Sequence, residues 1–241
     1  MSDSLLKFML GEGHVRGVAV RLSDSWQEML RRRRHGADVQ ELLGEMSAAS
    51  VLLAGSLKFD GTLVLQIQGD GPLRLAVAEC QPDFGLRATA TARGDDDAAG
   101  EAVDAAEADA DAEDATEAQA PAADFARLTN ARGAGRCVIT LDPRQRQPGQ
   151  QPYQGIVALN GADGHALQDL SAVLRQYLDQ SEQIPSWLML AADEHSACGL
   201  LVQRMPDAGG SAGAGAERAD EDFSRAVHLA STLQRDELLS L

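Results

Sequence analysis

The sequence predicts an α+β fold in which a mostly antiparallel sheet, built from hairpins, packs against a central helix and is followed by a C-terminal helical arm. Two stretches of alternating apolar residues flank a turn at residues 69–72, a helical apolar stripe covers residues 38–57, and a second such stripe begins near Asp220. The chain contains no run of about twenty apolar residues, so we expect neither a membrane-spanning helix nor a membrane partner.

Residues 58–80 are predicted to form the hairpin around which the chain is organised. The apolar residues of its two arms fall at alternate positions: Leu63, Leu65 and Ile67, then Leu73, Leu75 and Val77. A period of two residues is typical of a strand with one buried face. Glycine at positions 69 and 71 and proline at position 72 suit the turn between the arms. We expect the helix at 38–57 to cover this apolar face only in part.

The N-terminal part predicts a strand followed by a helix. Residues 14–22 alternate as a strand does, and Ser25 and Glu28 have the spacing of a capping box, which places the start of a helix there. Four arginines at 31–34 then fall at the end of this helix, where positive charge complements the helix dipole. The alternative interpretation is a patch for an anionic partner.

Residues 93–124 are predicted to form a disordered acidic insertion, inert or solubilising. From 94 to 124 the chain has twelve Asp or Glu and no Lys or Arg, which opposes compact folding. The formal net charge is −16, but the remaining 25 acidic and 21 basic residues give only −4. Nucleic acid is therefore an unexpected partner.

The second half predicts further strand pairs and a helix. We expect strands at 136–141, 153–159, 187–191 and 198–204, with a helix at 167–178. This completes a core domain over residues 1–206. Residues 207–219 are predicted to form a flexible linker, because glycine, alanine and serine dominate their first part. Residues 220–241 are predicted to form the helical arm, as the start of a truncated C-terminal region.

The sequence contains no convincing catalytic, cofactor or metal site, so we expect no enzyme activity. The cysteines Cys80, Cys137 and Cys198 are far apart and form no CxxC or CxC pair, as expected for buried thiols in a reducing cytoplasm. His195 lies three residues before Cys198, so a Cys–His nucleophile is an alternative. Because the N-terminus lacks the features of a signal peptide, the expected location is the cytoplasm.

Several motifs resemble those of the 33-kDa redox-regulated heat-shock chaperone family. The similar segments are LKFDG at 57–61, QIQGDGPLRLAVAEC at 66–80, YQGIV at 153–157, YLDQSEQIP at 177–185, GLLVQRMP at 199–206 and DELL at 236–239. The resemblance covers roughly residues 14–92, 125–206 and 220–241. It implies an ATP-independent holdase that binds partly unfolded proteins under oxidative or heat stress and forms homodimers, in some members by exchange of a C-terminal arm.

The resemblance also implies what this chain lacks. The family senses oxidants through a C-terminal zinc module with a CxC and a CxxC pair, and neither pair is present here. The chain thus resembles the client-binding core without its redox switch, and zinc is expected only in a full-length member. We expect an exposed apolar face, on the hairpin sheet or on the linker side, to bind clients. The alternative is an adaptor without chaperone activity that uses the acidic insertion as its contact.

Overall fold

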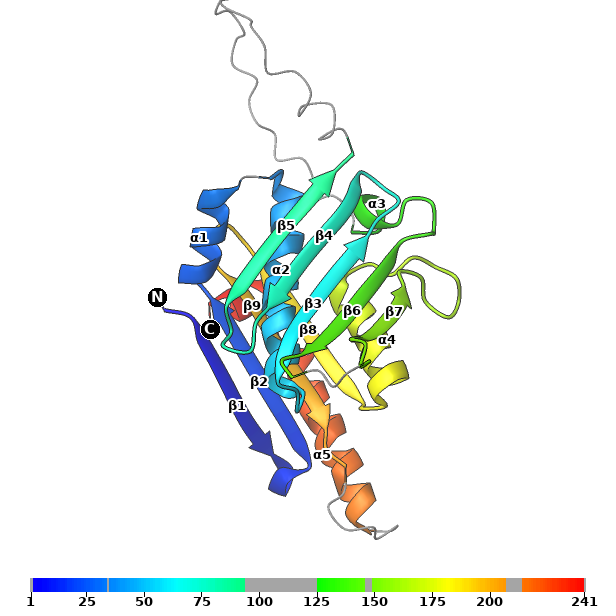
Figure 1. Ribbon diagram of the computed structural model, residues 1–241. Coiled ribbons are helices and arrows are strands. Elements are labelled where there is room, and N and C mark those ends of the chain that lie inside the picture. Colours follow the sequence, from blue (N-terminus) through cyan, green and yellow to red (C-terminus); the bar gives the residue numbers. More distant parts are fainter. Residues whose placement is uncertain (1, 34, 94–124, 146–148, 207–213, 241) are drawn as a thin grey trace, which may run out of the picture.

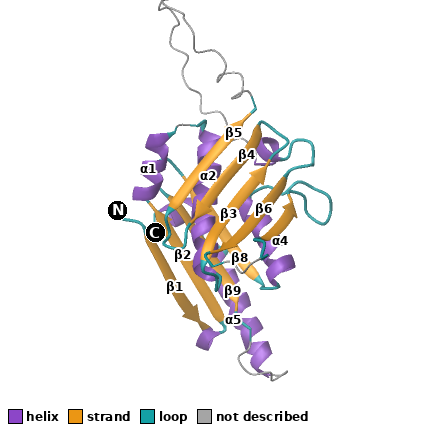
Figure 2. Cartoon of the chain, in the orientation of Figure 1, coloured by secondary structure: helices purple, strands orange, loops and turns teal. Residues whose placement is uncertain are grey.

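The computed structural model describes residues 2–33, 35–93, 125–145, 149–206 and 214–240. Two antiparallel sheets enclose the long helix α2 (Ala37–Ser56), as Figures 1 and 2 show. The predicted α+β class, with antiparallel strands packed on a central helix, is confirmed. The single sheet of that prediction is two sheets, one on each side of α2.

The strands pair in two orders. The four-stranded sheet runs β1-β2-β9-β8, with β1 (Ser4–Leu10), β2 (Val15–Leu22), β9 (Ala197–Arg204) and β8 (Ser186–Ala192). The five-stranded sheet runs β5-β4-β3-β6-β7, with β5 (Leu86–Ala92), β4 (Leu73–Cys80), β3 (Gly61–Gln68), β6 (Arg136–Pro143) and β7 (Tyr153–Ala158). The other helices are α1 (Asp24–Arg32), α3 (Phe125–Thr129), α4 (Leu170–Tyr177), α5 (Ala214–Ala230) and α6 (Arg235–Leu239). Two short turns, η1 (Gly11–Gly13) and η2 (Leu178–Glu182), complete the described elements.

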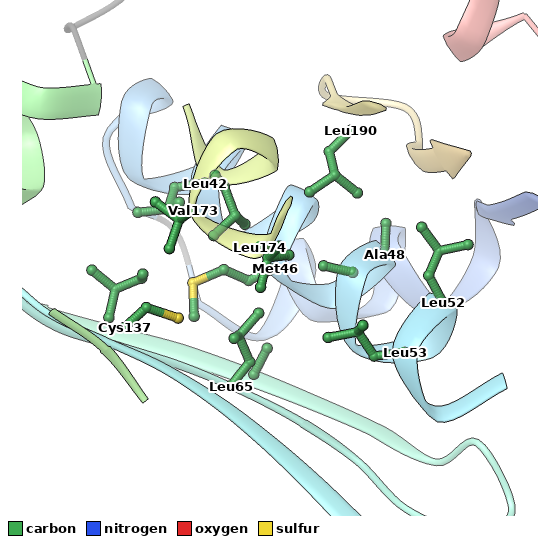
Figure 3. Packing of buried hydrophobic residues seen from close by; sticks show 14 of the residues in the cluster. Leu42, Met46, Ala48, Leu52, Leu53, Leu65, Cys137, Val173, Leu174 and Leu190 are labelled. Carbon is green, nitrogen blue, oxygen red and sulfur yellow. The ribbon is translucent and has the colours of Figure 1, made fainter. Parts of the chain in front are cut away.

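Helix α2 is buried on almost every side because a sheet lies on each of its faces. Met46 is fully buried and lies near Leu65 and Cys137 of the five-stranded sheet (Figure 3). On the other side, Gly44 allows close approach of β8: a Cβ atom there would lie 2.4 Å from the Cβ of Ala192. A helix that is apolar all round is the expected result of such burial.

The predicted hairpin is confirmed, but one of its faces was assigned wrongly. Strands β3 and β4 pair antiparallel, and Leu63, Leu65 and Ile67 are fully buried against α2. In β4, however, Leu75 and Val77 are only half-buried, on the outer face. The residues that face the core with Leu73 are Ala76, Ala78 and Cys80.

The physical reason is an irregularity in the pairing of β4 with β5. The register shifts between Leu73 and Leu75, and such a bulge moves every following side chain to the opposite face. The residues on the inner face of the hairpin are all at most 1% exposed and belong to the main core around α2. The expectation that the helix shields it only in part is wrong.

One further local prediction needs correction, and two elements were missed. The capping box at Ser25 and Glu28 does not form: the N-cap of α1 is Ser23, and the helix is capped from a distance by Asp3. The Asp3 carboxylate accepts hydrogen bonds from the backbone N–H of Ser23 at 2.7 Å and of Asp24 at 3.0 Å. Strand β1 and helix α3 were not predicted.

The predicted linker at 207–219 is too long at its C-terminal end. Residues 214–219 are the first turns of α5, where alanine, glutamate and arginine favour helix over the glycine-rich segment before them. Residues 207–213 lie outside the described part of the chain. The acidic tract at 94–124 also lies outside it, so the prediction of disorder there stays a prediction.

Candidate functional site

The C-terminal helices α5 and α6 lie on the face of the four-stranded sheet that points away from α2. Phe223, Ala226 and Ala230 of α5 pack on Val15 of β2 and Val202 of β9. These residues form an apolar cluster of their own, separate from the main core around α2. The contact therefore adds an outer layer to a sheet whose inner face is already packed.

Helix α6 extends this outer layer toward the other end of the sheet. Leu238 is fully buried against Ala191 of β8 and Cys198 of β9, and Leu239 packs beside it. The turn before α6 contributes Leu233 to the same cluster. We call the apolar sheet surface under α5 and α6 the covered face. Its members from the sheet are Val15, Trp187, Met189, Ala191, Cys198, Leu200 and Val202.

Polar contacts fix the position of α5. The Asp222 carboxylate lies 2.8 Å from Nδ1 of His14, which follows η1, and the Asp220 carboxylate accepts a hydrogen bond from Nε of Arg204 at 2.6 Å. Both carboxylates lie near the middle of α5, so these contacts hold the helix at the end of the sheet where β2 begins and β9 ends. Asp220 is largely exposed, which limits the strength of its ion pair.

A second set of polar contacts fixes α6. Arg235 donates a hydrogen bond to Oε1 of Glu41 on α2 at 2.9 Å, and it also donates to the carbonyl of Ala192 at the end of β8. Arg21 of β2 donates to the carbonyl of Leu239. Helix α6 is thus held by the fully buried side chain of Leu238, with Leu239 beside it, and by two guanidinium groups.

A partly buried carboxyl group lies next to the Arg235 contact. Burial and, to a smaller extent, the negative charges of Glu41 and Asp169 raise the pKa of Glu45 to about 8, although Arg235 acts in the opposite direction. Glu45 is therefore mostly protonated at neutral pH. The pKa shift makes this junction of α2, α4 and α6 sensitive to mildly alkaline pH.

The three thiols occupy different environments. Burial raises the pKa values of Cys80 and Cys137 to about 12, and both side chains belong to the main core. Burial also raises the pKa of Cys198, but this thiol lies under α6, with Nη1 of Arg21 at 3.9 Å from its sulfur atom. A protonated, buried thiol is a poor nucleophile.

The alternative of a Cys–His nucleophile is not supported. His195 is largely exposed and its Nε2 lies 3.3 Å from the Glu194 carboxylate, while the sulfur of Cys198 contacts Ser196 and Arg21. Within the described residues no group of three or more His, Cys, Asp or Glu side chains is placed to hold a metal ion. The described helices include none long and apolar enough to cross a membrane.

The cysteines do not fit the zinc that the resemblance implies for a full-length relative. Cys80 lies opposite Leu63 on one side of β3, and Cys137 lies opposite Ile67 on its other side. Four residues of strand separate these positions, roughly 13 Å along the sheet. Cys198 belongs to the other sheet. No two of these thiols are therefore placed to ligate one metal ion.

Sequence analysis missed the covered face, although a signal for it was present. Strands β8 and β9 are apolar at consecutive positions, with Leu188 and Leu190 facing the core and Trp187 and Met189 facing outward. A continuous apolar run in a strand indicates burial on both sides. The second layer over these strands is the helical arm, which was predicted without a docking position.

An apolar sheet face under a helical cover is the type of site that a polypeptide-binding protein uses. Comparisons with known proteins agree with this class. The sequence profile of the Hsp33 protein family matches residues 3–241. The chain therefore belongs to the Hsp33 family, a family of chaperones.

Curated relatives and a solved structure agree with this assignment. The 33 kDa chaperonin of Chromobacterium violaceum is 38% identical over 239 residues, which cover 99% of this chain and 67% of the relative. That of Methylobacillus flagellatus is 37% identical, with 100% of this chain and 68% of the relative covered. The crystal structure of the Thermotoga maritima 33 kDa chaperonin matches with a TM-score of 0.58 at 19% identity, over 82% of this chain and 59% of that one, which supports the fold. This chain spans about two thirds of the length of the two curated relatives.

Proposed function

We propose that this chain acts as an ATP-independent, non-enzymatic holdase whose client-binding surface is the covered face. The observation that carries the proposal is the outer layer formed by α5 and α6, whose apolar clusters are separate from the main core. Loss of this layer exposes Trp187, Leu200 and Val202 without opening the packing around α2. Partly unfolded proteins present apolar segments that would bind such a face.

The cover is built so that moderate stress can release it. Helix α6 has only five residues, and isolated helices of that length are unstable in water. Its docking depends on Leu238 and on guanidinium contacts at the protein surface. Heat therefore opens this layer before it opens the core. This order of events fits a chaperone that is needed when other proteins begin to unfold.

Some features of the whole protein extend the proposal. Full-length relatives would carry the redox-sensitive zinc module beyond the segment that matches this chain, and zinc would hold that module folded. Exchange of the α5–α6 arm between two copies would produce a homodimer, with each arm covering the other copy's sheet. The expected site of action is the cytoplasm. The adaptor hypothesis rests only on the acidic tract, which lies outside the described residues, and no relative supports it.

The proposal is tested by heating an aggregation-prone enzyme with the chain and recording light scattering. We expect Phe223→Asp, which displaces α5, to suppress aggregation more strongly than the wild type. Leu200→Asp, which charges the sheet surface itself, should abolish suppression while the main core stays folded. Leu229→Asp is the matched control, because Leu229 is also on α5 but is 66% exposed.

The outcome that overturns the proposal is equally defined. If uncovered and wild-type proteins both leave light scattering unchanged, under reducing and oxidising conditions, the chain is not a holdase. If Leu200→Asp suppresses aggregation as well as Phe223→Asp does, clients bind elsewhere on the molecule. Circular dichroism melting curves of each variant show whether the core remains folded.

A further inference from the structure

Exposed arginines gather at one end of the five-stranded sheet, around the turn between β3 and β4. Helix α3 lies against this turn (Figure 1), and a Cβ atom at Gly71 would lie 2.5 Å from the carbonyl oxygen of Arg127. The end of β5 and the start of β6 lie on either side, because β5 pairs with β4 and β6 pairs with β3. We call these exposed residues the arginine end; they are Arg74, Arg93, Arg127, Arg132 and Arg136.

Two of these guanidinium groups form hydrogen bonds with neutral oxygen atoms of the turn and of β3. Nε of Arg93 donates to the carbonyl of Gly71 at 2.7 Å, and Nε of Arg136 donates to Oε1 of Gln68 at 2.6 Å. These contacts hold both side chains beside the turn without neutralising their charge.

The carboxylate of the turn itself is engaged by the backbone. Asp70 accepts hydrogen bonds from the N–H groups of Arg132 at 3.1 Å and Ala134 at 2.7 Å. The turn and the arginine end together carry five positive charges and one negative charge, a formal net charge of +4. A concentration of positive charge on an exposed surface attracts polyanions.

The sequence attaches a polyanion directly to this surface. The acidic tract at 94–124 starts immediately after Arg93 and ends immediately before Phe125, the first residue of α3, and it has twelve Asp or Glu and no Lys or Arg. Both attachment points thus lie at the arginine end. Such tethering gives an effective concentration on the order of millimolar. An anion from solution is instead repelled by the net charge of −16.

We propose that the acidic tract at 94–124 binds the arginine end of its own chain. Guanidinium groups suit this role because their planar fork matches the geometry of a carboxylate. Exposed ion pairs contribute little one at a time, so the affinity depends on the number of charges and falls as salt is added. The arginine end and the covered face belong to different sheets, so this proposal does not depend on chaperone activity.

The first test measures the binding of a fluorescent peptide of residues 94–124 to two forms of the full chain. One form has the natural tract, and in the other form its twelve Asp and Glu are replaced by Asn and Gln. The neutralised form should bind the peptide about tenfold more tightly or more, because its arginine end is unoccupied, and about 0.5 M NaCl should remove most of this binding. Equal dissociation constants for the two forms, or binding to neither, overturn the proposal.

Substitutions in the neutralised form locate the binding surface. Arg127→Gln, Arg132→Gln and Arg136→Gln together should abolish peptide binding. Arg87→Gln with Arg144→Gln is the matched control, because both arginines are exposed at the opposite end of the same sheet, where each pairs with a carboxylate. The control should bind the peptide as the neutralised form does. Binding that survives the triple substitution, or that the control also loses, excludes the arginine end as a specific surface.

The second test detects the contact within one chain. The three native cysteines are buried, so a nitroxide label can be attached selectively to Ala110→Cys in the tract. The amide NMR signals of Gly71 and Ala134 should broaden at low salt, and the triple substitution should reduce this broadening. The tether alone does not depend on the three arginines, so equal broadening with and without them overturns the proposal. An oligonucleotide that binds the intact chain through the same arginines would overturn it in favour of a nucleic-acid surface.

Discussion

Replacement of Leu238 by alanine tests whether α6 is a separable cover. Leu238 is fully buried between α6 and the sheet, against Ala191 and Cys198, and it is the only fully buried side chain that the described part of α6 contributes. The substitution removes most of the apolar contact that holds this five-residue helix. The main core around α2 does not include Leu238 and should be unaffected.

The expected size of the effect follows from burial. A buried leucine replaced by alanine costs about 2–5 kcal/mol. Because α6 can relax onto the sheet, we take about 3 kcal/mol, which shifts the ratio of docked to undocked helix by roughly 100-fold. This cost falls on the docking of α6 rather than on global unfolding, since the helix belongs to a separate cluster.

Cys198 provides the assay. Its thiol is fully buried under α6, and burial raises its pKa. Undocking removes that burial and leaves the Arg21 guanidinium beside the sulfur, so both accessibility and ionisation increase. Alkylation with iodoacetamide, followed by mass spectrometry of peptides, should show Cys198 reacting on the order of 100-fold faster in Leu238→Ala than in the wild type.

Internal controls make the result decisive. Cys80 and Cys137 lie in the main core, so they should stay protected in the variant as in the wild type. Leu229→Ala, at an exposed position of α5, should leave all three rates unchanged. If Cys198 stays protected in Leu238→Ala, or if all three thiols become reactive together, α6 is not a separable cover and the reasoning fails.

Three further predictions concern stability. The pKa of Glu45 is raised to about 8 in the folded state, so the folded protein holds this proton more tightly than the unfolded chain does. The free energy of unfolding should therefore fall as pH rises from about 4.5 to 8, by at most about 1.4 kcal/mol per pH unit. Glu45→Gln should flatten this pH dependence in urea titrations, and an equal slope in both proteins would refute the prediction. Gly44→Ala should lower stability by about 1–3 kcal/mol, because the clash with Ala192 outweighs a helix-propensity gain of about 1 kcal/mol. Gly36→Ala, with open space around it, is the control, and a stabilised Gly44→Ala would contradict the close packing. Asp3→Ala should lower the free energy of unfolding by about 0.5–2 kcal/mol, because it removes the cap of α1, and the melting temperature should fall. Asp3→Asn should be less destabilising, because the amide oxygen can still accept a hydrogen bond from the first N–H groups of α1.

The periodicity of apolar residues along the chain correctly predicted strand β3 and helix α2. Leu63, Leu65 and Ile67 alternate and do face the core, and the stripe at 38–57 corresponds to α2. The assignment failed at Leu75 and Val77, because a bulge inverted the faces of β4 after Leu73. Such a shift depends on the partner strand, and nothing in the periodicity of β4 itself indicates it.

Long-range contacts account for the other differences. The cap of α1 comes from Asp3, twenty residues before Ser23, so the local capping box at Ser25 and Glu28 was a misleading signal. Strand β1 lacks polar alternation because both of its faces are largely exposed, and an alternating pattern arises only where one face is buried. The docking of α6 on Cys198 is a tertiary contact that the amphipathic pattern of the arm does not specify.

The presence of large side chains on both sides of β8 and β9 has a thermodynamic consequence. One side of these strands packs in the main core around α2, and the other side is buried only as long as α5 and α6 stay docked. Warming can therefore undock α5 and α6 while β8 and β9 stay folded on the main core. On the proposed function, the exposed apolar area available to clients would then increase with temperature before the protein unfolds.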